Sequence, residues 1–431
     1  MSRGMIYFIT LTFWVIPYNS VMADEVLSWQ DCIKEASLNH PDLIAAQDVV
    51  KESEASKNIT ASGLLPQITS DVSASRSKTA VTGGLGNGNA PSQTANSFSY
   101  GVSGSQLIFD GFKTVNSVKA AQQTIKASQQ SYRYTSTQVR LRLRTAFINL
   151  LYAQELVLVA QDIVKIRKSN LDLIKLRYQS GLEHRGALLT AEANLAQAEF
   201  QVSQAKRDIG LAQRQLTKEM GRTQFVPMTA KGDLIVVDTE KTMPDFESIA
   251  KNNPSLLQVT AQKNAAEFSL KSTYGNFSPS LSLSSGVDKS GDRWSPRGNE
   301  WDLGLKVSFP LFEGGERLAQ VAQAKATLHQ FIENERSEKD SVVYALAQEW
   351  VALQDDIETV EVQKKQLAAA VERSEIANAE FSTGFMTYDN WTIIEDNLVQ
   401  AKTSFLSAQD NALLAEANWI QAKGEMLEYV K

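Results

Sequence analysis

The stretch 113–219 contains no proline and is interrupted once, at Tyr178–Gly181. Its apolar residues recur at three- and four-residue steps, as in Leu143, Phe147 and Leu150, which predicts helix rather than strand. At about 1.5 Å per residue, the first arm would be roughly 95 Å long, far more than a compact domain needs. Many positions carry Ala, Gln, Ser or Asn, which suits close packing against several helices. The pattern therefore predicts a long helical hairpin that is part of an assembly.

The same hairpin occurs a second time, at 316–422, so the chain contains an internal duplication. Matching residues are separated by 213 positions early in each copy and by 203 later: Pro41 and Pro254, Pro66 and Pro279, Phe109 and Phe312, Tyr178 and Phe381, and Gly181 and Gly384. The difference in length falls in a Gly/Asn-rich loop at 83–89, since loops absorb insertions. We expect a mainly α-helical protein built from a duplicated helix-strand-strand-helix unit.

The first residues have the features of a secretory signal. Segment 1–23 holds Arg3, an apolar core over 6–16 and a small-residue cleavage site ending at Ala23. The apolar run is shorter than the ~20 residues of a spanning helix, so we expect export and not anchoring. No later stretch is apolar enough to span as a helix, so a membrane crossing would use strands. The single cysteine, Cys32, lies in a predicted helix, where it has no internal disulfide partner and a lipid anchor is not expected.

Residues 28–62 are predicted to form one helix with Ser28 as its N-cap. A β-hairpin follows in each copy, at about 66–109 and about 279–312, and in both hairpins apolar residues alternate with small or charged ones, as at 98–105. Each run is close to the ~9–11 residues of a membrane-crossing strand. The four strands would therefore have lipid on one face and water on the other.

A half-buried soluble sheet would alternate in the same way. Four strands cannot close a barrel, however, and an open edge in lipid leaves backbone groups unsatisfied. On the membrane interpretation, several protomers must share one barrel.

Residues 222–253 differ in composition from the repeats. They contain Pro227, Gly232 and Pro244, and a short apolar run at 234–237, which predicts a linker with a small strand on the outside of the helices. The predicted organisation is a signal peptide (1–23), a first repeat (24–221), an inter-repeat or equatorial linker (222–253), a second repeat (254–424) and a C-terminal tail (425–431).

The ordered set of features resembles the TolC family of outer-membrane efflux channels over nearly the whole mature chain. The features are a proline before each β-hairpin, the segments leading into the long helices (Leu107–Gly111 and Phe309–Gly315), and the tips Tyr178–Gly181 and Phe381–Gly384. The resemblance implies a homotrimer in the outer membrane of a Gram-negative bacterium, with a shared twelve-stranded β-barrel and a long periplasmic α-barrel tunnel. It also implies docking through a periplasmic adaptor to an inner-membrane transporter.

Catalysis has little support in the sequence. The histidines (His40, His184 and His329) fall in unrelated places, and no phosphate-binding glycine loop precedes a helix. The acidic run Glu333–Asp340 alternates with bases, which predicts a solvated helix face and not a metal site. We expect no enzyme activity, no cofactor, no metal and no nucleic-acid partner.

Each long hairpin reverses at a glycine, Gly181 and Gly384, as expected where a helix ends in a left-handed residue. Leu182, Phe385 and Met386 lie beside these glycines and are predicted contacts for the adaptor, because an apolar residue at a loop tip buries nothing in its own chain.

The resemblance also implies a periplasmic gate at the tip of the second hairpin, often closed by polar links from a tyrosine and an arginine. This chain has Phe381 and Met386 at those positions, so closure would rest on packing of Phe381, Tyr388 and Trp391. Groups of the first hairpin, Tyr178 and Arg185, would help.

A charged residue follows the second tip, and two roles are open for it. Asp389 would form an acidic ring that favours cations, or, with Thr387, would cap the returning helix.

The two hairpins carry opposite charge. Segment 113–219 has 17 Lys and Arg against 8 Asp and Glu, a net of +9, and 316–422 has 8 against 18, a net of −10. Alternating hairpins around a ring would place unlike charges side by side, although two solvated faces would look the same. The function expected is an exit duct for efflux or type I secretion, and the alternative is a secreted coiled-coil scaffold without a pore.

Overall fold

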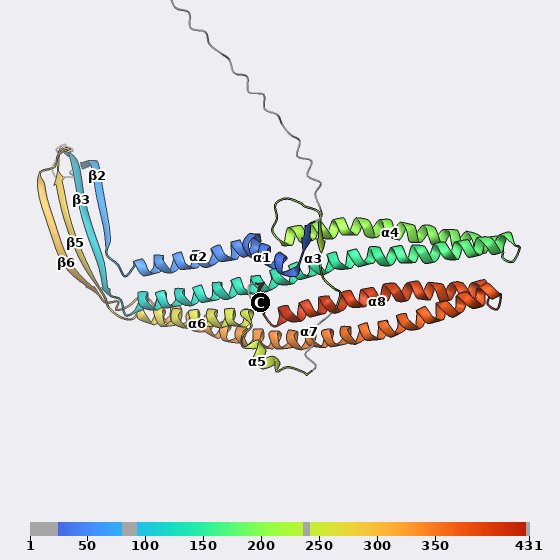
Figure 1. The fold of residues 1–431 in the computed structure, drawn as a ribbon. Coiled ribbons are helices and arrows are strands. Elements are labelled where there is room, and N and C mark those ends of the chain that lie inside the picture. The colour runs from blue at the N-terminus through green and yellow to red at the C-terminus, as the bar shows by residue number, and fades with distance from the viewer. Residues whose placement is uncertain (1–24, 80–92, 236–241, 428–431) are drawn as a thin grey trace, which may run out of the picture.

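The computed structural model describes residues 25–79, 93–235 and 242–427, and it is an elongated molecule with a sheet at one end of a layer of long helices (Figure 1). In chain order the elements are β1 (Glu25–Leu27), α1 (Trp29–Asn39), α2 (Pro41–Ser62), β2 (Gln67–Thr79), β3 (Gln93–Phe109), α3 (Lys113–Gln179), α4 (Arg185–Glu219), β4 (Met228–Ala230), α5 (Phe246–Ala250), α6 (Pro254–Gly275), β5 (Ser280–Gly291), β6 (Gly298–Ser308), α7 (Glu316–Thr383) and α8 (Tyr388–Ala422). A helix, two strands and a long helical hairpin occur twice, which confirms the predicted fold class.

Helix α3 lies at the centre of the helical layer. It has 67 residues and packs on α2 and α6 in its first half and on α4 and α8 in its second half. Helix α7 packs on α6 and then on α8, so α4 and α7 form the two edges far from the sheet (Figure 1). Buried alanines recur every seven residues along α4, at Ala191, Ala198, Ala205 and Ala212. This spacing lets α4 lie close along α3, as in a coiled coil.

The largest apolar core lies at mid-length, where Phe147 and Ile148 of α3 pack with Met228 and Leu427 from distant parts of the chain. One stretch of α3 meets the length and composition of a membrane-spanning helix. The expectation that no later stretch would do so was therefore wrong. The reason is that α3 supplies much of this core, so it needs apolar residues for packing.

The helix predicted over 28–62 is two helices. Ser28 caps α1 as expected, and its side chain accepts a hydrogen bond from the Asp31 N–H. The chain breaks at His40, because Pro41 disfavours helix at the residue before it. Nδ1 of His40 then accepts from the Asp42 N–H at 3.2 Å and caps α2.

The strand predicted at 234–237 was wrong where the structure describes it. Leu234 and Ile235 are not in a strand, and 236–237 lie outside the described residues, as does the loop 83–89. The strand is β4, which pairs in parallel with β1. Leu234 is buried in the central core, and its carbonyl accepts a hydrogen bond from Gln409 of α8. The segment therefore crosses α3 and α8 on one face.

The four-stranded sheet is antiparallel with the order β2-β3-β5-β6, so β2 and β6 have unpaired edges. Cross-strand partners bring like side chains together. Val102 pairs with Val287, which pairs with Trp301, on an apolar exposed face. On the other face Asp288 pairs with Gly101 and with Glu300. The predicted alternation is confirmed, although β3 has 17 residues, which is more than expected.

Candidate functional site at the hairpin tips

Both long hairpins turn through a glycine with a left-handed backbone. The φ angle is +74° at Gly181 and +85° at Gly384, a conformation that residues with a Cβ adopt only at a cost. Beyond these glycines, Leu182 is 65% exposed and Phe385 is 88% exposed. Met386 differs, because it is half-buried against the apolar cluster at the tip.

The tip of the second hairpin is built on a buried phenylalanine. Phe381 is fully buried, and its ring stacks on Trp391 with centroids 4.5 Å apart and an interplanar angle of 10°. Tyr388 lies against both rings. Ile174 and Ala187 of the first hairpin complete the cluster. The structure therefore brings together the three aromatic residues singled out in the sequence, and their role as a gate stays a prediction.

Arg177 joins the first hairpin to this cluster. Its Nη1 donates to the Phe381 carbonyl at 2.9 Å, and its guanidinium lies 4.5 Å from the centroid of the Phe381 ring. Glu183 lies 3.6 Å from its Nε. Tyr178 and Arg185, the first-hairpin groups expected here, are both exposed. Among the described residues, neither makes a hydrogen bond or ring contact with the three aromatic residues. Sequence reasoning missed Arg177, whose only signal was a base in the last turn of α3.

A buried carboxylate forms a second link between the hairpins. Glu395 of α8 is 1% exposed. Its Oε2 accepts from Asn170 of α3 at 3.0 Å, and its Oε1 accepts from Ser374 and Asn378 of α7. The Trp391 Nε1–H donates to Asn378 Oδ1 at 2.7 Å. The network therefore ties α3, α7 and α8 together, and nothing in the sequence marked it.

Ion pairs join α3 to α8 from the tip toward the centre of the molecule, and we call this row of contacts the α3–α8 seam. They are Arg167 with Asp396 (2.6 Å), Asp162 with Lys402, and Arg144 with Glu416 (3.5 Å). Burial lowers the pKa of Arg144, and the Glu416 carboxylate opposes that shift. Unlike charges thus meet within a protomer, between the hairpins of opposite net charge.

Asp389 is exposed in the first turn of α8. Thr387 occupies the N-cap position, but its side chain makes no capping hydrogen bond. The cap expected from Thr387 is therefore not made, and Asp389 interacts favourably with the positive end of the helix through its charge.

Two of the histidines cap helices by accepting a hydrogen bond from a backbone N–H. His184 accepts from the Ala187 N–H at 3.1 Å and caps α4, as His40 caps α2. Within 25–79, 93–235 and 242–427, no group of three or more His, Cys, Asp or Glu side chains could hold a metal ion.

An open-edged sheet with one apolar and one polar face, continued by helical hairpins linked at their far ends, is the architecture of an outer-membrane channel subunit. A profile of the outer membrane efflux protein family matches residues 32–222 and 246–428, and the chain belongs to this family. The family consists of transport channels of the Gram-negative outer membrane and is not an enzyme family.

The individual relatives are distant in sequence, and a solved structure of similar fold is known. The outer membrane efflux protein BepC of Brucella suis is 22% identical over 397 residues, which cover 91% of this chain and 84% of BepC. The outer membrane protein TolC of Escherichia coli is 23% identical over 301 residues, 66% of this chain and 61% of TolC. The Campylobacter jejuni CmeC outer membrane channel superposes with a TM-score of 0.79 at 18% identity, covering 98% of this chain and 94% of that one.

Proposed function

We propose that this protein is a homotrimeric outer-membrane channel-tunnel that serves as the exit duct of a tripartite efflux or type I secretion system. The observation that carries the proposal is the four-stranded sheet with unpaired β2 and β6 edges, an exposed apolar face and a polar face. Unpaired edges cannot remain in lipid, so β2 of one copy pairs with β6 of the next until the barrel closes.

The partners follow from the tips. Leu182 and Phe385 are large apolar side chains exposed at the ends of the hairpins farthest from the sheet. A periplasmic adaptor docks there and connects the duct to an inner-membrane transporter. Met386 contributes from its half-buried position, and Gly181 and Gly384 shape the two turns.

The entrance is closed at the same end. The stacked Phe381 and Trp391, together with Tyr388, form the closing contact, and Arg177 holds the first hairpin against it. Opening separates α8 from α3 along the seam of ion pairs. The protein has no catalytic role.

A coiled-coil scaffold without a pore is the alternative. It gives no reason for a sheet whose apolar face carries Trp301, Leu303 and Leu305, each more than half exposed. Such a face would promote aggregation in water and is stable in lipid.

The test is assembly and conductance of the full mature chain. In mild detergent we expect a trimer by light scattering, and ion conductance after insertion into a planar bilayer. A monodisperse monomer that still forms pores would refute the shared barrel, and a trimer without conductance would favour the scaffold. Co-purification of the adaptor identifies the pump class.

A further inference from the structure

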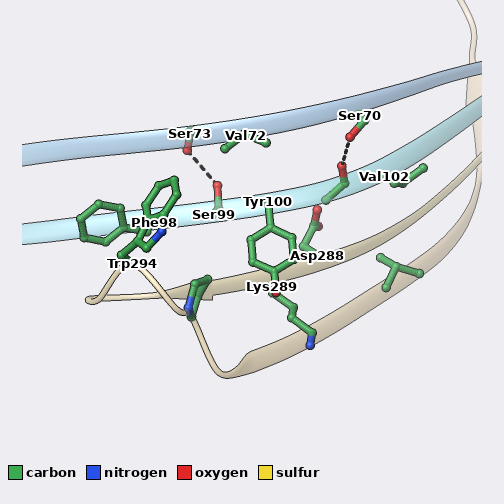
Figure 2. Close-up of a pocket in the computed structure, with 13 residues that line it drawn as sticks. Ser70, Val72, Ser73, Phe98, Ser99, Tyr100, Val102, Asp288, Lys289 and Trp294 are labelled. Carbon is green, nitrogen blue, oxygen red and sulfur yellow. Dashed lines mark hydrogen bonds between the residues drawn. The ribbon is translucent and has the colours of Figure 1, made fainter.

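A pocket of about 560 Å³ opens on the sheet near the end farthest from the helices (Figure 2). Its apolar lining comes from Val72, Tyr100 and Val287, which share one face of neighbouring strands. Trp294, in the turn between β5 and β6, closes one side and meets Phe98 edge to face, with ring centroids 5.8 Å apart. The pocket is therefore a groove on the apolar, exposed face of the sheet.

Lys289 lines the same pocket, directly across from Tyr100, and both side chains project from the apolar face (Figure 2). By alternation along β2, Arg76 and Lys78 lie on this face as well, beyond Val72. Arg76 is four residues from Val72, about 14 Å along the strand. Arg76 and Lys78 therefore border the groove on the side away from the helices, and Lys289 lies at the level of Tyr100.

The charges of the sheet are segregated between its faces. By strand alternation the opposite face carries Asp71, Asp288, Glu300 and Asp302, with Lys306 as its base, whereas the strand positions of the apolar face carry bases and no acid. Asp288 also borders the pocket, next to Lys289 in β5 (Figure 2). Among the described residues, Arg76, Lys78 and Lys289 form no ion pair. Unpaired bases beside a lipid-facing groove favour an anionic lipid, because negatively charged head groups attract Lys and Arg side chains by about 1 kcal/mol each.

We infer that this groove binds a phosphorylated glycolipid of the outer leaflet, with its acyl chains against Val72, Tyr100 and Val287 and its phosphates on Lys289 and Arg76. The inference rests on the proposed barrel, which places the apolar face in lipid and the strand ends far from the helices at the outer leaflet. Charge complementarity selects the anionic lipid, and the aromatic wall of Phe98 and Trp294 sits at the level of the head group.

The test measures retention of diphosphoryl lipid A by the full mature protein in mild detergent, using native mass spectrometry, with dephosphorylated lipid A as the comparison probe. We expect diphosphoryl lipid A to bind more tightly, and Lys289→Gln and Arg76→Gln each to weaken it about fivefold, the effect of about 1 kcal/mol per base near a charged lipid surface. Lys306→Gln is the matched control, because it removes a base from the same sheet on the other face.

Equal binding of the two lipid A forms would overturn the inference, and so would unchanged binding by both pocket variants or an equal loss in Lys306→Gln. Binding of phosphatidylglycerol as tight as that of lipid A would overturn the assigned occupant. Conductance of each variant separates this inference from the channel function. A normal conductance with no lipid preference refutes the lipid site alone, and an absent conductance in the unmodified protein refutes the channel.

Discussion

Arg177 contacts Phe381 in two ways, through a hydrogen bond from its Nη1 to the Phe381 carbonyl (2.9 Å) and through its guanidinium over the Phe381 ring (4.5 Å). The two residues belong to different hairpins, and Phe381 is also stacked on Trp391. A single side chain of the first hairpin thus holds both the backbone and the aromatic core of the second.

Arg177→Ala should therefore loosen the closed tip. It removes a charge-assisted hydrogen bond and a cation–π contact, together worth about 2–3 kcal/mol. We expect larger or longer openings in planar bilayers, with the trimer retained. Lys175→Ala is the control, since Lys175 is an exposed base of the same helix, two residues before Arg177. Equal effects of the two substitutions would contradict the assigned role.

The seam between α3 and α8 predicts a charge-swap result. Asp162→Lys and Lys402→Asp should each weaken the contact between the hairpins, and the double variant should recover. Both side chains are partly exposed, so the coupling energy should stay under about 1 kcal/mol and fall with added salt. The pair lies within one protomer, so the measurement is the free energy of unfolding at low and high salt, with the exposed pair Asp48–Lys51 as the control. Unfolding that is unaffected by both added salt and the charge swap would show that this pair does not hold the two hairpins together.

The three arginines at mid-length, Arg140, Arg142 and Arg144, have separate partners. Arg144 pairs with Glu416, and Arg140 pairs with Glu425 of the C-terminal segment. Arg142 instead pairs with Asp42 and Glu219, both from its own repeat. Reversing all three charges would therefore disturb three different contacts, and the seam is better tested at Asp162 and Lys402.

Asp389→Asn should lower the preference for cations and the block by multivalent cations. The carboxylate is exposed at the tip, and the proposed trimer would place three copies around the entrance. Reversal potentials in a salt gradient measure the effect. An unchanged potential in a normally folded trimer would leave Asp389 with its interaction at the helix end, worth about 0.3–1 kcal/mol.

Asp410 of α8 should make stability depend on pH. Burial raises the pKa of its carboxyl to about 6, above the value in the unfolded chain. Because the folded state then holds the proton more tightly, stability falls as pH rises from about 4 to 6 and stays lower above that range. Asp410→Asn should flatten this part of the profile and stabilise the protein at pH 7.5 by about 1–2 kcal/mol, since one pKa unit is about 1.4 kcal/mol.

Thermal unfolding followed by circular dichroism from pH 4 to 8 checks this expectation. Asp340→Asn serves as the matched control, because Asp340 is exposed and lies inside helix α7, away from its ends. A profile for Asp410→Asn that is parallel to the unmodified protein would show that the carboxyl does not titrate in this range.

Local patterns determined how much of the fold was predictable. The long helices were readable because periodic apolar residues and the turn glycines Gly181 and Gly384 act within a few residues of one another. Contacts between distant segments were not readable. The β1–β4 pair joins two three-residue strands about two hundred positions apart, and strands so short have no pattern of their own. For the same reason Leu234 and Ile235, the described part of the apolar run at 234–237, were wrongly predicted to be in a strand.

The candidate site, too, was predictable only where its residues lie close together in the sequence. The aromatic cluster was predictable because Phe381, Tyr388 and Trp391 lie within one turn and its flanking helices. Arg177 and Glu395 were not, because their partners lie on other helices and no spacing in the sequence connects Asn170 with Glu395. Met386 was assigned as an exposed contact, yet its position after the turn folds it back onto the tip cluster.

The helix order has a genetic consequence. Since α3 and α8 are joined inside the protomer, the two edges left for neighbours are different surfaces, α4 on one side and α7 on the other. Contacts between unlike surfaces make a head-to-tail ring, in which every subunit takes part in two interfaces. A subunit with a damaged α7 edge still has an intact α4 edge. It can therefore join a ring, and that ring then has one defective interface. Alleles altered along α7 should therefore be dominant negative when expressed beside the unmodified gene, whereas alleles that abolish folding should be recessive.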